Sequence, residues 1–305
     1  MQYRRPKKNI SGILLLDKPL GFSSNQALQK VKWLFQAAKA GHTGTLDPLA
    51  TGLLPLCFGE ATKFAHYLTD ADKTYIATIK LGVTTNTGDA EGEVLTTKEV
   101  NVSLAQFSQS CSNFVGEISQ TPPMYSALKH EGKALYEYAR AGIEIERKSR
   151  LISIHSIVLN SFEGDIGEVT VTCTKGTYIR TLAEDIGAAL GCGAHLIGLR
   201  RTHTANYHIE QTVTLEQFES MTLDQRQATL MPMDSAVLHL PAVVLDVDRT
   251  HYLRQGQAVW QSDVSIKGLF RLYNEQQEFL GLGEQDDDGK IAPKRLIINN
   301  DNVVD

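Results

Sequence analysis

The chain has 305 residues, of which 42% are hydrophobic, and its formal net charge at pH 7 is −5. This length and composition suit one large globular domain and a small one, and they exclude a chain that is disordered throughout. The longest purely apolar runs, such as Ile13 to Leu16, are far too short to span a bilayer.

The amino-terminal start lacks the pattern of a secretory leader. It is basic, with Arg4, Arg5, Lys7 and Lys8. The apolar stretch that follows has only about five residues, whereas a signal peptide has about 7 to 15. We therefore expect a cytoplasmic protein.

The first predicted elements are a strand and a helix. The apolar run from Ile13 to Leu16 is typical of a buried strand. Ser23 or Ser24 caps the helix that follows, because a serine hydroxyl accepts hydrogen bonds from free backbone N–H groups. The helix is predicted from apolar residues at helical spacing, which are Ala27, Leu28, Val31, Leu34 and Phe35.

The segment from Gly41 to Pro55 reads GHTGTLDPLATGLLP and places one carboxylate, Asp47, among glycines. Glycine permits backbone angles that other residues resist, and Pro48 favours an extended conformation at Asp47. From these residues alone, two interpretations stay open. Either Asp47 lies in a stiff loop suited to chemistry, or it caps a helix that the following leucines suggest.

Two later segments, residues 75–81 and 169–173, alternate between apolar and polar side chains, as half-buried strands do. Residues 86–92 predict an irregular connection between them. Strands mixed with helices in this way indicate an α+β domain whose sheet is flanked by helices.

A glycine turn and a helix follow the second of these strands. The turn is predicted at Lys175 and Gly176, and apolar residues then share one helical face over residues 179–190. Tyr178 and Arg180 therefore lie at the junction of the turn and the helix.

The pattern changes near residue 239. From there on, short β-like runs with glycine turns replace helical patterns, at residues 242–247, 265–273, 279–282 and 295–298. We predict a large domain over 1–238 and a small β-rich domain over 239–305. A domain of about 65 residues buries too little apolar surface to be robust alone, so we expect it to pack on its neighbour.

The cysteines and glycines give no sign of a metal or a cofactor. The four cysteines, which form no Cys-x-x-Cys pair and predict structural thiols, are Cys57, Cys111, Cys173 and Cys192. His195 is near Cys192, but no further ligands follow at zinc spacing. Gly191-Cys-Gly193 is only a fragment of a dinucleotide fingerprint. We predict no metal and no cofactor.

The segment from Gly41 to Pro55 resembles the catalytic-loop signature of the tRNA pseudouridine synthase B (TruB) family. The match is long and specific, with a mild departure at Thr45, where alanine is common. Further segments resemble the family in the expected order and together cover most of residues 11–205. They are Leu14–Pro19, Gly59–Lys63, Asp72–Tyr75, Pro123–Lys129, Lys175–Arg180 and Gly191–His195.

The resemblance implies a pseudouridine synthase catalytic domain with a mixed, mainly antiparallel sheet. Residues 239–305 are similar, by position and pattern, to the PUA domain that ends many bacterial TruB proteins. The implied activity is isomerisation of uridine to pseudouridine at position 55 in the T loop of tRNA, by base flipping and an aspartate-dependent break of the glycosidic bond. The implied partner is the tRNA T stem-loop, with no membrane and no obligate protein partner.

The resemblance also implies roles for individual residues. Asp47 is the nucleophile, although attack at C1′, attack at C6 and a glycal route all stay open. Arg180 is the candidate ion-pair partner of Asp47, and Tyr75 stacks on the target base and is a candidate for moving the C5 proton. The remaining implied residues are His42, Tyr178 and Leu199 as substrate contacts and Lys18 with Pro19 as support.

An insertion at about 125–150 mixes cations and aromatic side chains, which suits an element that clamps RNA. The negative net charge does not exclude an RNA partner, because the local distribution of charge decides binding. Two rival functions stay open. An RNA-folding chaperone needs neither Asp47 nor Arg180, and a carboxylate-dependent glycosidase needs a second carboxylate motif, which we do not find.

Overall fold

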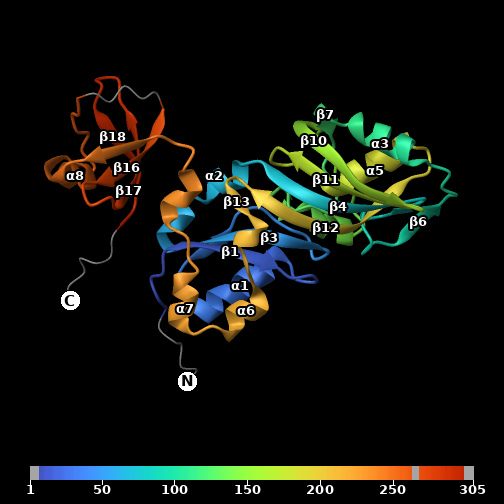
Figure 1. Ribbon diagram of the computed structural model, residues 1–305, viewed down its shortest axis with the longest axis horizontal. Helices are drawn as coiled ribbons and strands as arrows, with labels where there is room; N and C mark the ends of the chain where they lie inside the picture. The colour runs from blue at the N-terminus through green and yellow to red at the C-terminus, as the bar shows by residue number, and fades with distance from the viewer. Residues whose placement is uncertain (1–6, 263–267, 299–305) are drawn as a thin grey trace.

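The computed structural model describes residues 7–262 and 268–298, which form a large amino-terminal domain and a small carboxy-terminal domain (Figure 1). Arg4 and Arg5 of the basic start lie outside the described residues. So do residues 265–267, which begin one of the predicted β-runs. Within the described ranges, no helix is long and apolar enough to cross a membrane.

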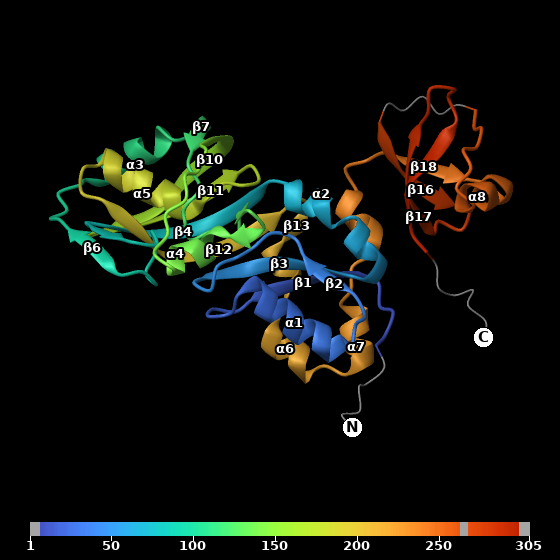
Figure 2. The same ribbon diagram turned by 180° about the vertical axis from the view of Figure 1, so that it is seen from behind.

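A ten-stranded sheet forms the spine of the large domain (Figures 1 and 2). Its strands are β1 (Gly12–Lys18), β2 (Ala40–His42), β3 (Ala50–Phe58), β4 (Lys73–Leu81), β7 (Gly116–Gln120), β10 (Arg150–Glu163), β11 (Ile166–Cys173), β12 (Ala194–Thr204), β13 (Tyr207–His208) and β14 (Val213–Thr214). The order is β14-β1-β3-β12-β4-β11-β10-β7, with β2 paired to β3 and β13 to β12. β1 runs parallel to β14 and β12 runs parallel to β3, while the other neighbours are antiparallel. The predicted mixed, mainly antiparallel sheet is confirmed.

Helices cover the sheet, and one of the two serines suggested by the sequence caps the first of them. They are α1 (Ser24–Phe35), α2 (Ala65–Asp70), α3 (Leu104–Ser112), α5 (Ile179–Ala189), α6 (Leu215–Ser220) and α7 (Leu223–Ala228). Ser23 is the N-cap of α1 and forms a capping box with Gln26. Ser24 is instead buried, and its hydroxyl bonds the backbone of Leu46.

The central strands are buried on both faces. In β1, Leu14 and Leu16 pack in the layer that contains α1, α5 and α6, whereas Ile13 and Leu15 pack on the other face with α2. Because alternate side chains of a strand point to opposite faces, a strand between two layers is a continuous apolar run. The same holds for β3, so the alternative of a helix after Asp47 is wrong.

The small domain is a four-stranded sheet with one helix. It contains β15 (Ala242–Leu245), α8 (Val247–Arg254), β16 (Leu269–Asn274), β17 (Phe279–Gln285) and β18 (Ile291–Leu296). Its β-rich character is as predicted, but the predicted run 242–247 ends early because Asp246 caps α8. Phe279 packs on Phe64 of the large domain, with ring centroids 5.4 Å apart. The two domains therefore share apolar contacts.

Two small hairpins project from the large domain. One pairs β5 (Val83–Thr85) with β6 (Val94–Thr97). The other lies in the insertion between β7 and β10, where β8 (Lys129–His130) and β9 (Lys133–Ala134) precede α4 (Leu135–Arg140). This insertion matches the predicted segment at about 125–150 in position, and its residues 126–128 reach the pocket described next.

Candidate active site

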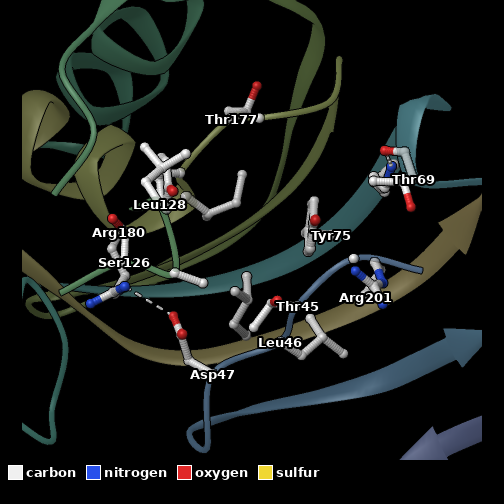
Figure 3. Close-up of a pocket in the computed structure, with 17 residues that line it drawn as sticks. Thr45, Leu46, Asp47, Thr69, Tyr75, Ser126, Leu128, Thr177, Arg180 and Arg201 are labelled. Carbon is white, nitrogen blue, oxygen red and sulfur yellow. Dashed lines mark hydrogen bonds and ion pairs between the residues drawn. The ribbon is translucent and has the colours of Figure 1, made fainter. Parts of the chain in front are cut away.

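A pocket of about 310 Å³ opens beside the loop that carries Asp47 (Figure 3). It is lined by residues 44–47 of that loop, Tyr75 of β4, Leu199 and Arg201 of β12, residues 176–180 before and in α5, and residues 126–128 of the insertion. Segments that are far apart in sequence thus contribute to one cavity. Of the sequence-predicted residues, Asp47, Tyr75, Tyr178, Arg180 and Leu199 are brought together here.

Hydrogen bonds to residues distant in sequence fix the Asp47 loop. The Gly21 N–H donates to the Pro48 carbonyl at 2.9 Å. The Leu46 N–H donates to the Ser24 hydroxyl at 2.7 Å. The loop connects β2 to β3, and with anchors on both sides of Asp47 its carboxylate is held in place without a helix.

Arg180 faces two carboxylates. Its Nη2 lies 3.1 Å from Asp47 Oδ2, and its Nη1 lies 3.3 Å from Asp89 Oδ2. The same guanidinium donates to the carbonyls of Thr87, at 2.9 Å, and Tyr125, at 2.6 Å. The Arg180 side chain is only 6% exposed, whereas that of Asp47 is 41% exposed. Arg180 is therefore fixed from several sides, and Asp47 keeps an open face toward the pocket.

The surroundings of Asp47 act on its pKa in opposite directions. Burial of the group raises the pKa of the Asp47 carboxyl above its ordinary value, and the nearby Asp89 adds to the rise. Arg180 and, more weakly, Lys18 lower it. The carboxylate is thus poorly hydrated on its inner side and balanced by a fixed cation, as a carboxylate nucleophile requires.

The aromatic and apolar residues of the pocket come from the central strands and from the start of α5. Tyr75 is buried and Leu199 lies half-buried on the neighbouring strand. Tyr178 is the N-cap residue of α5. The Gln120 side-chain amide holds the backbone of Tyr178 with two hydrogen bonds. Its oxygen accepts from the Tyr178 N–H at 2.8 Å, and its nitrogen donates to the Tyr178 carbonyl at 3.1 Å. Arg150 lies over the Tyr178 ring, 5.1 Å from its centroid.

The remaining predicted residues lie around the pocket. His42 ends β2 and does not line the pocket; burial lowers the pKa of its ring, and its Nδ1 is buried without a partner among the described residues. Lys18 ends β1, fully buried, and its Nζ donates to the carbonyls of Pro19 and Phe22. Burial lowers the pKa of Lys18 to about 8. Lys18 and Pro19 thus hold the backbone next to the loop.

Sequence reasoning missed several residues that shape this site. Asp89 lies in the connection predicted as irregular, and Lys73 and Arg201 stand two residues from Tyr75 and Leu199 on their strands. A period of two along a strand is the signal that could have found Lys73 and Arg201. Across residues 7–262 and 268–298, no three His, Cys, Asp or Glu side chains form a metal-binding group.

The sequence matches models of known families over most of its length. Residues 32–179 match the model described as TruB family pseudouridylate synthase (N terminal domain). Residues 180–238 match the tRNA pseudouridylate synthase B C-terminal domain, and residues 241–297 match the C-terminal model of pseudouridine synthase II TruB. The chain belongs to the TruB family.

Full-length relatives of the TruB family are similar to this chain from end to end. The tRNA pseudouridine synthase B of Methylobacillus flagellatus is 61% identical over 97% of this chain and 98% of its own. That of Pseudomonas putida is 53% identical over 97% of this chain and 98% of its own. That of Chromobacterium violaceum is 52% identical over 97% of both chains.

Among solved structures, the fold is similar to a chain of a Cbf5–Nop10–Gar1 complex. The TM-score is 0.71 at 27% identity, with 93% of this chain and 84% of that chain covered. A chain of an H/ACA ribonucleoprotein bound to a substrate RNA containing 2′-deoxyuridine has a TM-score of 0.72 at 22% identity, and covers 98% and 93% of the two chains. The pseudouridine synthase fold therefore extends over nearly the whole chain.

Proposed function

We propose that this TruB-family protein is a tRNA pseudouridine synthase that isomerises uridine 55 in the T loop. The observation that carries the proposal is the half-exposed Asp47 carboxylate, paired at 3.1 Å with the buried Arg180 at the edge of the pocket. Its relatives bear the name tRNA pseudouridine synthase B. An isomerisation moves no electrons to or from an acceptor, which suits the prediction that no cofactor is used.

Asp47 acts as the nucleophilic carboxylate in this proposal. Arg180 keeps it ionised through its contact with Oδ2, and the Asp47 side chain lines the pocket that would receive a nucleoside. The carboxylate helps to break the bond between C1′ and N1, the freed uracil turns, and C1′ joins C5. Binding alone would not require a nucleophile balanced in this way, so the pair favours the enzyme over the chaperone.

The target uridine must leave its stack to reach Asp47, because a paired or stacked base cannot enter the pocket. Tyr75 and Leu199 offer the two apolar surfaces between which a flipped base can lie, and Tyr178 supplies a ring and a hydroxyl near the entrance. Stacking on an aromatic side chain contributes about 1 to 3 kcal/mol per base. His42, at the end of β2, is proposed to fill the gap in the RNA.

In this proposal, the two domains bind different parts of the tRNA. Residues 1–238 form the catalytic domain and its insertion clamps the T arm, while residues 239–305 form a PUA-like domain that holds another part of the tRNA. The insertion presents Lys133 against Tyr138 and Arg140 against Tyr136, at 4.8 and 5.4 Å from the ring centroids. Such cation and aromatic pairs suit contacts with phosphates and bases.

Release of tritium from an unmodified tRNA transcript labelled at C5 of uridine tests the proposal, with the modified position mapped afterwards. We expect release with wild type at the T-loop uridine, and loss of release with Asp47→Asn at tRNA affinity within a few fold of wild type. Tight binding without release by the wild-type protein would favour the chaperone. Free uracil would favour the glycosidase.

A further inference from the structure

Arg201 stands directly opposite Tyr75. The two residues are register partners in the antiparallel pair of β12 and β4, and both line the pocket. Side chains of directly opposed residues on one face of a sheet lie about 4.5–5.5 Å apart at Cβ. Figure 3 shows Arg201 next to Tyr75 and on the far side of that ring from Asp47 and Arg180.

A glycine lets the backbone of β3 approach the backbone of Arg201 closely. On the other side of Arg201, β3 contributes Gly52, whose absent side chain would meet the Arg201 carbonyl oxygen at 2.3 Å. Arg201 Nε donates to the Leu53 carbonyl at 2.7 Å. The side chain is thereby anchored at Nε, and its two terminal nitrogens remain for the pocket.

Arg201 is a buried cation without a carboxylate partner. The residue is 1% exposed, and no ion pair within the described ranges involves it. Its Nη2 is buried and has no hydrogen-bond partner there. Burying an unpaired charge is costly, and buried donors are nearly always satisfied. Arg180, by contrast, contacts two carboxylates, so an unpaired Arg201 points to a partner that acquires negative charge during the reaction.

Lys73 is a second cation near Tyr75, but its N–H donors are occupied by backbone carbonyls. Lys73 Nζ donates to the carbonyls of Leu68, Thr69 and Ala71 at 3.1, 2.7 and 2.6 Å, which occupies all three of its N–H groups. Burial raises the pKa of the Tyr75 phenol, and the charge of Arg201 is the largest influence that opposes the rise. Arg201 is therefore the group that favours a phenolate at Tyr75.

We propose that Arg201 is a positioning residue for Tyr75: its guanidinium holds the phenolic oxygen and stabilises the negative charge that this oxygen carries when it removes the C5 proton. This inference rests on the proposed function, because a C5 proton is removed only if C1′ joins C5. The two arginines of the pocket then have separate roles. Arg180 pairs with the Asp47 carboxylate, which helps to break the bond between C1′ and N1. Arg201 stabilises the Tyr75 oxygen, which removes the C5 proton.

The proton transfer balances. After C1′ has joined C5, C5 is tetrahedral and N1 is doubly bonded to C6. The phenolate oxygen takes the C5 proton, the C5–H electron pair forms the C5–C6 double bond, and the C6–N1 pair moves to N1. The phenol then gives the proton to N1, which regenerates the phenolate. The net result is transfer of one proton from C5 to N1, with no other reactant.

The isotope effect on pseudouridine formation tests this role. We would compare tRNA that carries deuterium or hydrogen at C5 of uridine, under single-turnover conditions, with wild type and Arg201→Gln. Removing the charge should slow product formation about 10- to 100-fold, less than the roughly 10²- to 10⁴-fold that a general acid or base itself contributes, because Tyr75 remains. It should also enlarge the C5 isotope effect above that of wild type, because proton removal becomes the slow step.

Matched variants separate this role from a structural one. Arg200→Gln removes a charge from the adjacent position of β12, where Arg200 pairs with Asp17 at 2.7 Å, and should leave both the rate and the isotope effect unchanged. Arg201→Lys keeps the charge with a shorter reach and should lie between wild type and Arg201→Gln. If Arg201→Gln does not fold, Arg201→Lys carries the test.

The outcomes are distinct. A slower Arg201 variant with a wild-type isotope effect would overturn the inference and leave the proposed function standing. Absence of pseudouridine with wild type would instead contradict the proposed function. Equal slowing of Tyr75→Phe and of the Tyr75→Phe, Arg201→Gln double variant would support the inference, because Arg201 acts through the Tyr75 oxygen. Additive slowing would oppose it.

Discussion

Asp47 and Arg180 meet at 3.1 Å although one lies in the loop before β3 and the other in the first turn of α5. Arg180 is buried and held by the carbonyls of Thr87 and Tyr125, so Asp47, whose side chain is 41% exposed, is the partner that faces the pocket. The cation is thus a fixed part of the site, and its charge lowers the pKa of the Asp47 carboxyl against the effect of burial.

The pH dependence of product formation should reveal this effect. In the proposed mechanism Asp47 acts as the ionised carboxylate, so activity should fall as the pH drops through its pKa. Arg180 lowers the pKa of Asp47, and its replacement by Lys weakens the contact, which should move the acidic limb to higher pH. Asp89 raises the pKa of Asp47, so Asp89→Asn should move the same limb to lower pH. Single-turnover rates measured across the acidic range check both signs, and shifts in the same direction would contradict the assignment.

Gly52 should be hard to replace. Its φ is +102° and a Cβ there would lie 2.3 Å from the Arg201 carbonyl oxygen. Gly164 also has a positive φ, +60°, but has open space around it. We expect Gly164→Ala to cost about 1 kcal/mol of unfolding free energy, and Gly52→Ala to cost about 1–3 kcal/mol more because the backbones must separate. Denaturant unfolding of the two variants measures the difference, and equal losses would show that β3 and β12 accommodate the methyl group.

Three cysteines should resist thiol reagents in the native protein. Burial raises the pKa of Cys57 to about 12 and the pKa values of Cys111 and Cys173 to about 11. The thiolate is the reactive form, so at pH 8 these residues should react only when the chain unfolds. Mass spectrometry of peptides after labelling, with and without denaturant, tests this. Rapid native labelling of Cys57 would contradict its burial on the face of the sheet that packs with α2.

Phe279 should couple the small domain to the large one. Its ring packs on Phe64 at 5.4 Å and on Tyr273 at 5.6 Å. Phe279→Ala removes this contact and should raise KM for full-length tRNA several fold, while KM for an isolated T-arm hairpin stays near that of wild type. The reason is that only full-length tRNA reaches both domains. An equal rise with both substrates would argue against a holding role for residues 239–305.

The sequence patterns predicted several strands but did not predict the helix of the small domain. The alternation in residues 75–81 and 169–173 predicts β4 and β11, because a strand with two different faces shows a period of two. The helix α8 (Val247–Arg254) was not predicted from the sequence, because its residues are polar on most sides and form no apolar stripe. Its one local signal is the Asp246 cap.

The sequence alone determined the local features of this protein: the apolar run of β1, the helical spacing of α1, the glycines around Asp47, and the family to which these motifs belong. Each depends on residues within a few positions of one another. Only the tertiary structure decided that Asp89 contacts Arg180 and that Arg201 faces Tyr75. These contacts depend on the order β3-β12-β4 and on the register of its strands. Packing of distant segments sets that order, and no local propensity encodes it.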